Sequence, residues 1–336
     1  MALDGAAFSP KQFGIAIQAE STIGTKATDG MTRVNVDSVE MPGFNLTQIM
    51  EARSGSAGRV TDKDDILIDQ KGVVKEITFS GVLDTTVAAL LIQNCIAKED
   101  SANIVSIAYD YSPPELETGD NSSITIADTI TVAVLNPNTG SNANMIFPGC
   151  TISSLQITGD MGNESGRLRF SATARTGYIA EFNQAAPTVA AYGDNTGFYS
   201  LATFSGAKTI AGCADSVIQS FSLNIENPSE FVGQADSNGN PEAIVRAVPE
   251  ISATLDATIK YDANTSGLMN SMNTGADAPT LLCTHDALSN ASTTFGIQGD
   301  EARITSLAYN EANAMMIDVS TKFVAGASGN VLQIHY

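Results

Sequence analysis

The sequence has no tryptophan and is poor in histidine and cysteine. Two of the 336 residues are histidine, and the four cysteines, Cys95, Cys150, Cys213 and Cys283, form no C-x-x-C pair. A structural zinc site needs such residues at close spacing, so the sequence carries no zinc motif. We therefore expect four buried, reduced thiols.

Charged residues are also scarce, at 16%, and basic residues are the scarcer sign. There are 17 Lys and Arg against 37 Asp and Glu, which gives a formal net charge of −20. Nucleic-acid binding through phosphates needs clustered basic side chains, so that function is excluded. No run approaches the roughly 20 apolar residues of a membrane span, and no signal peptide is recognised, so no membrane partner is expected.

The residue patterns of common enzymes are absent as well. His285 stands beside Asp286, but no G-x-S-x-G nucleophile motif accompanies them, and His335 is the penultimate residue. The segment Gly206–Thr209 lacks the glycine that a phosphate-binding loop places before its lysine. We expect no catalytic residue and no cofactor.

Two acidic segments raise the question of calcium. Asp236 and Asn238 begin a D-x-N-x-N pattern, but Pro241 stands where an EF-hand loop needs glycine. The segment Asp62–Asp65 also lacks the glycine at the sixth position. The sequence favours solvated loop tips, and calcium binding by these loops stays open.

What is abundant favours a mainly β protein. Hydrophobic residues make up 43%, and Ser, Thr, Asn and Gly supply much of the remainder. Helical spacing appears in Thr85–Ile96, with Asp84 as the expected N-cap, and again in Thr265–Met272. Alternating apolar and polar residues predict strands at 14–20, 32–45, 75–84, 104–111, 124–135, 145–159, 166–180, 217–226, 251–261, 280–285, 293–298, 302–309 and 314–324.

Short sequence matches recur in the same order in both halves of the chain. Ser38-Val39 matches Ser216-Val217, and Leu83-Asp84 matches Leu255-Asp256. Ile152-Ser153-Ser154-Leu155 matches Ile304-Thr305-Ser306-Leu307. The order predicts an internal duplication, and the length fits two domains of roughly 150 residues.

The predicted organisation is two tandem β-sandwich domains, each with a flanking short helix. The first domain covers 31–182 and the second covers 209–336. Residues 1–30 are expected to pack on the first domain. Residues 183–208 lose the alternation and gain Pro, Ala and Gly, so they are predicted to be the linker.

These features together resemble the tail tube proteins of long-tailed, siphovirus-like bacteriophages. The resemblance is carried by the segments 38–45, 75–96, 152–178, 216–226, 251–272 and 304–323. It implies a β-sandwich whose inner strands join across subunits into a barrel around a lumen. It also implies stacked rings forming a tube that conducts DNA into the host.

The resemblance further implies the partners. A two-domain relative forms a ring of three chains where single-domain relatives use six, so a trimer is favoured over a hexamer. The other expected partners are the tape-measure protein, a tail terminator or distal tail protein, and passing DNA that is not specifically bound. The expected location is the virion tail, and the host cytoplasm during assembly.

Two sets of residues are candidates for these roles. The segments 51–71 and 227–250 are the expected inter-ring loops, with candidate contacts Arg53, Arg59, Asp62, Asp64, Asp65, Asp236 and Asn238. The alternation of Ile251–Tyr261 places one polar set on a single face. The candidate lumen-facing residues of that set are Thr254, Asp256, Thr258 and Lys260.

Two other functions compete with a tail tube. A capsid decoration or fibre protein would share the composition and the lack of catalytic motifs, but it would not form hollow rings. A carbohydrate hydrolase on a β scaffold usually presents an aromatic platform, whereas aromatic residues here are 6% with no tryptophan. The sequence therefore favours a structural assembly protein.

Overall fold

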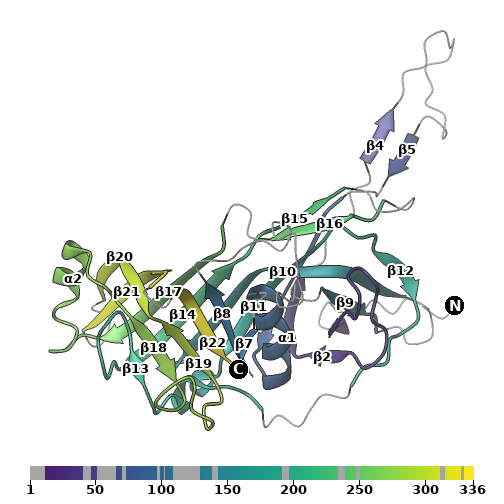
Figure 1. Ribbon diagram of the computed structural model, residues 1–336. Helices are drawn as coiled ribbons and strands as arrows, with labels where there is room; N and C mark the ends of the chain where they lie inside the picture. Colours follow the sequence, from purple (N-terminus) through teal and green to yellow (C-terminus); the bar gives the residue numbers. More distant parts are fainter. Residues whose placement is uncertain are drawn as a thin grey trace, which may run out of the picture.

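The computed structural model describes residues 12–40, 47–50, 66–69, 73–96, 99–101, 103–108, 129–137, 143–190, 197–233, 239–246, 250–310, 315–326 and 329–336. Antiparallel strands dominate these ranges, which confirms the mainly-β fold class. The described residues form two α-helices, α1 (Thr85–Ile96) and α2 (Leu268–Thr274). In Figure 1, β20 (Glu301–Asn310), β21 (Met316–Val324) and α2 lie at one end, and β9 (Ile130–Leu135) and β12 (Glu181–Gln184) lie toward the other.

One large sheet joins the two halves of the chain. Eight of its described strands follow the order β3-β6-β11-β10-β14-β17-β21-β20. The first half supplies β3 (Val36–Glu40), β6 (Lys75–Val82), β11 (Arg169–Thr176) and β10 (Asn144–Asp160). The second half supplies β14 (Ile218–Glu226), β17 (Ser252–Lys260), β21 (Met316–Val324) and β20 (Glu301–Asn310). The halves meet where β10 pairs with β14.

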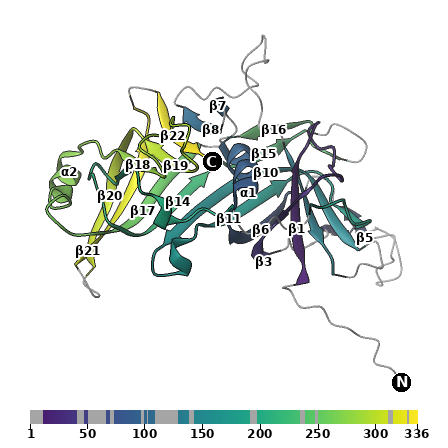
Figure 2. The same ribbon diagram turned by 90° about the horizontal axis from the view of Figure 1, so that it is seen from below.

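Further strands cover this sheet. The first part of β10 continues into a layer with β9 (Ile130–Leu135), β1 (Gly14–Ala19), β2 (Thr32–Val34) and β12 (Glu181–Gln184). A separate sheet has the order β13-β18-β19-β22-β8-β7. Its strands are β13 (Lys208–Thr209), β18 (Thr280–Cys283), β19 (Gly296–Gly299), β22 (Asn330–His335), β8 (Ile104–Ala108) and β7 (Glu99–Ser101). Because β22 pairs with β8, the C-terminus lies near the middle of the molecule (Figure 2).

The core lies between these layers because apolar and polar side chains alternate along the strands, so that one face of each strand is apolar. On β6, Ile77 and Phe79 are fully buried while Glu76 points to the other face and is exposed. Phe79 meets Phe170 of β11 edge to face, with ring centroids 5.9 Å apart. All four cysteines are buried and free, as the sequence predicted. Burial of the apolar face is the main force that holds the layers together.

An aspartate precedes each helix, but only Asp84 caps the first turn of its helix, because Gly267 is the N-cap residue of α2 and makes no side-chain cap hydrogen bond. Asp84 Oδ1 accepts hydrogen bonds from the backbone N–H groups of Thr86 at 3.0 Å and Val87 at 2.8 Å. The helix expected at 85–96 and its cap are therefore confirmed. The second helix begins later than expected, because Asp262 Oδ1 accepts from the N–H groups of Asn264 and Thr265 in a preceding turn.

The prediction that 51–71 and 227–250 are loops is partly wrong, because both segments contain strands. The strand β4 (Thr47–Met50) pairs with β5 (Ile66–Asp69), and β15 (Ser229–Val232) pairs with β16 (Ala243–Arg246). Figure 1 shows β4 and β5 standing away from the body of the molecule. Four-residue strands give too short an alternation to recognise, and the same reason explains why β7, β12 and β13 were missed.

The two four-strand sets match each other in detail. Each has a register shift on its first strand, between Val36 and Ser38 in β3 and between Ile218 and Ser220 in β14. Each has a second shift, between residues 152 and 154 of β10 and between residues 304 and 306 of β20. The strand order within each set is also the same, because the third strand along the chain, β10 or β20, lies at the end of its set farthest from the first strand.

This correspondence corrects two of the three sequence matches. Ser38 corresponds to Ser220 rather than to Ser216, because both follow the register shift. The pairing partners then match Asp84 with Asp262. Asp84 caps α1, and Asp262 accepts hydrogen bonds in the turn that precedes α2. The third match, at 152–155 and 304–307, holds in register. Short Ser, Thr and Asp matches recur by chance in this composition.

Candidate assembly surface

One face of the eight-strand order is polar, and we call it the open face. On β17 it carries Thr254, Asp256, Thr258 and Lys260, of which Asp256 and Lys260 are exposed and the threonines are half-buried. The intervening residues Ala253, Leu255, Ala257 and Ile259 are buried on the core side. The four predicted residues therefore share one face of one strand, as the alternation indicated.

Hydrogen bonds between side chains link neighbouring strands across the open face. Thr258 Oγ1 donates to Asp318 Oδ1 at 2.7 Å, and the Gln156 amide donates to Ser222 Oγ at 3.0 Å. Further links join Ser38 with Ser80 at 2.8 Å, Thr78 with Thr173 at 3.1 Å, and Asn310 with Asp318 at 3.3 Å. These hydroxyl, amide and carboxylate groups make the open face polar.

The basic groups of the open face are mostly neutralised. Arg175 Nε lies 2.9 Å from Glu76 Oε1, and Lys322 Nζ lies 3.3 Å from Glu250 Oε1. Arg169 forms ion pairs with Asp37 and Glu164, and Arg303 with Asp277. Within the described part of the chain, Lys260 is the basic residue of this face without an ion pair. A phosphate group thus meets few unpaired cations here.

The strands β3 and β20 form the two edges of the eight-strand order. In the described ranges β3 pairs with β6 alone and β20 with β21 alone. Tyr309 of β20 is 50% exposed, although it lies on the core side of the sheet. A strand edge with unsatisfied backbone groups is a site for pairing with another chain.

The chain matches a known family over most of its length. The sequence model of the phage tail tube protein family matches residues 14–325. The chain belongs to the phage tail tube family. It is therefore a structural component of the virion tail that assembles with copies of itself into a tube. No curated protein matches it.

The predicted inter-ring residues of this tail tube protein lie outside the described residues. Arg53, Arg59, Asp62, Asp64 and Asp65 fall between β4 and β5, and Asp236 and Asn238 fall between β15 and β16. The described parts are the bases of the two hairpins. Each hairpin joins the first and second strands of its four-strand set, so the two occupy the same place in the chain order.

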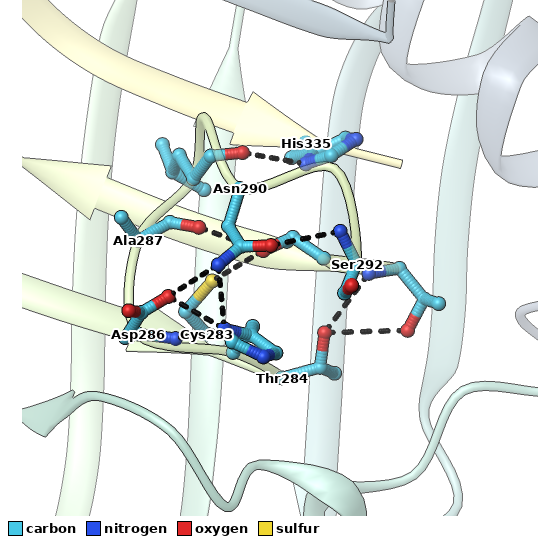
Figure 3. Close-up of polar contacts among 11 residues, drawn as sticks. Cys283, Thr284, Asp286, Ala287, Asn290, Ser292 and His335 are labelled. Carbon is cyan, nitrogen blue, oxygen red and sulfur yellow. Dashed lines mark hydrogen bonds and ion pairs between the residues drawn. The ribbon is translucent and has the colours of Figure 1, made fainter.

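His285, which stands beside Asp286, belongs to the segment between β18 and β19. Figure 3 labels its neighbours Asp286 and Asn290. His285 Nδ1 lies 2.5 Å from Asp286 Oδ1 and 2.8 Å from the amide nitrogen of Asn290. Hydrogen bonds from His285 and Asn290 lower the pKa of the Asp286 carboxyl. Asn290 Oδ1 also accepts from the backbone N–H of Ser292 at 2.9 Å. These contacts join residues of a single turn, which they hold in shape.

His335, the second histidine, is buried near this turn, and its Nδ1 lies 2.8 Å from the carbonyl oxygen of Leu288. The described residues contain no group of three or more His, Cys, Asp or Glu side chains placed to hold a metal ion. None of the described helices is both long enough and apolar enough to cross a membrane.

Proposed function

We propose that three copies of this tail tube protein close one ring, and that stacked rings form a conduit for DNA entering the host. The supporting observation is the pair of matching four-strand sets within one continuous sheet. Three such chains supply six equivalent sets, so a six-fold-like ring closes with half the number of subunits. The units we propose are 31–182 and 209–336, with 1–30 packed on the first and 183–208 as the linker.

The open face is the proposed lining of the lumen, with Thr254, Asp256, Thr258 and Lys260 among its residues. Its hydroxyl groups and paired cations support this assignment, because DNA phosphates find little to hold them. DNA and the tape-measure protein pass along such a surface without specific binding. The role needs neither a cofactor nor a catalytic group.

The two hairpins are the proposed contacts between rings. β4 and β5 stand away from the body (Figure 1), and β15 and β16 occupy the corresponding position in the second set. In this arrangement the segments that carry Arg53, Arg59, Asp62, Asp64, Asp65, Asp236 and Asn238 reach the neighbouring ring. A tail terminator or distal tail protein takes the place of a neighbouring ring at an end of the tube.

Electron microscopy of the purified protein tests the function directly. We expect hollow rings and tubes from the full chain. Deletion of residues 54–66 leaves folded subunits and rings but prevents long tubes. A length-matched deletion of residues 114–126, to which no ring contact is assigned, keeps the tubes. Solid particles or fibres from the full chain reject the tube, and normal tubes from the first deletion reject the inter-ring role alone.

A further inference from the structure

We propose that the edge strand β20 of one subunit pairs antiparallel with β3 of a second copy, in the register that β10 and β14 use within each chain. The inference rests on the proposed ring and adds the strands and the residues that join its subunits. It follows from the matching strand sets, because the chain already contains one junction between two such sets.

The equivalence of the strands fixes which edges meet. The register shifts match β3 with β14 and β20 with β10. In the chain, β10 is the last strand of the first set and pairs with β14, the first strand of the second. The second set ends in β20, and the first set begins with β3. Each chain therefore carries both halves of the same junction at its two edges. Head-to-tail contacts of this kind form a ring when the rotation between subunits closes on itself.

The exposure of equivalent side chains agrees with a missing neighbour on β20. Leu155 and Ile157 of β10 are fully buried, each opposite an apolar residue of β14. Their counterparts on β20 are Leu307, which is half-buried, and Tyr309, which is 50% exposed. An apolar strand edge of this kind is stabilised when a second strand covers it.

Side chains on β3 are likewise less buried than their counterparts on β14. Phe221 of β14 is 3% exposed beneath the junction with β10. Its counterpart Val39 on β3 is only half-buried, and Ser38 beside it is exposed. Both edges thus have the apolar alternation of the internal junction without its burial.

The internal register predicts one residue pair between chains. Thr158 of β10 lies opposite Ser222 of β14. The counterparts of these residues are Asn310 and Glu40, by the same register shifts. We therefore place Asn310 of one subunit opposite Glu40 of the next, with both side chains on the open face.

A disulfide cross-link tests this register. Directly opposite residues of an antiparallel pair have Cα atoms about 4.5–5.5 Å apart, which lies within the range of a disulfide. We expect the full-chain double variant Glu40→Cys/Asn310→Cys to form, on oxidation of assembled rings, covalent oligomers up to a closed ring. Because β3 and β20 are opposite edges of the sheet, the bond has to join different chains. The four native cysteines are buried and do not compete.

Two other double cysteine variants serve as controls for the position of the cross-link. Glu40→Cys with Ala308→Cys shifts the pair by two residues on the same face, and Glu40→Cys with Tyr309→Cys uses opposite faces. Both should link far less than the predicted pair. Mixing the two single variants Glu40→Cys and Asn310→Cys should give dimers as the largest product. Rings that link preferentially through a control pair overturn the register.

Hydrogen exchange of the unmodified protein tests the same junction even if the cysteine variants fail to assemble. Amides of β3 and β20 should become protected when subunits form rings. Unprotected edges in assembled rings overturn the junction, and the proposed tube function stands. Absence of rings from the unmodified protein overturns the proposed function instead.

Discussion

At the scale of single residues, Tyr199 shows how burial changes the chemistry of a side chain. Its ring packs on Phe295 with centroids 4.7 Å apart, and the residue is 6% exposed. Burial, with the nearby Asp84 carboxylate and Tyr336, raises the pKa of the Tyr199 phenol to about 12. The folded protein therefore keeps this proton in a pH range where an unfolded chain loses it.

Replacing Tyr199 should alter alkaline unfolding. An unfolded tyrosine ionises near pH 10, so the folded state loses stability as the pH rises from about 10 toward 12. Tyr199→Phe keeps the ring packing and removes this contribution, so its stability should fall less over that range in urea unfolding. Tyr309→Phe, at a residue that is 50% exposed, should behave like the parent protein. Equal slopes for all three proteins would contradict the assignment.

The surroundings of some buried polar side chains could not be predicted from the sequence, and Glu20 is an example. Glu20 is 3% exposed and accepts hydrogen bonds from the backbone N–H groups of Gly24 and Gly149, both at 2.8 Å. It also accepts from the hydroxyl groups of Thr129 and Thr131. Gly24 is only four residues away, but the other three donors are more than 100 residues from Glu20, so the sequence around Glu20 does not indicate a buried carboxylate.

At the scale of elements, the helix caps were predictable where the signal is local. The cap of α1 needs only Asp84 and the two amides that follow it, and both the helix and its cap were predicted. The hairpin strands were not, because a short strand forms only when a partner supplies its hydrogen bonds. For the same reason β22 was missed, although Leu332 and Ile334 are fully buried.

The matching aspartates should stabilise the two halves by similar amounts. We expect Asp84→Ala and Asp262→Ala each to lower the free energy of unfolding by about 1 kcal/mol, because two backbone amides lose their acceptor in the first turn of α1 and in the turn before α2, respectively. Asp84→Asn and Asp262→Asn keep an acceptor oxygen and should cost only a fraction of that. Denaturant unfolding of the four variants measures the difference. An alanine variant no less stable than its asparagine counterpart would show that the aspartate does not stabilise the turn at that site.

At the scale of the whole molecule, we expect the ion pairs of the open face to limit its attraction for DNA. Freeing Arg175 by Glu76→Gln should raise the affinity of the protein for duplex DNA severalfold at low salt, with the gain lost as salt is added. Fluorescence anisotropy with labelled DNA measures it. Glu181→Gln makes the same charge change beside Lys26, away from the open face, and is the control. A similar gain from both variants would show that net charge alone matters.

The sequence by itself determined the β class, the place of most strands, the helix α1 with its cap and which residues of β17 share a face. Each of these depends on periodicity or on neighbours within a few residues, which local physics sets. The tertiary structure decided that β10 joins β14, that the repeat aligns Asp84 with Asp262, and that Arg175 meets Glu76. Alternation fixes the face of a strand but not its partner, because backbone hydrogen bonds are the same for every residue type except proline.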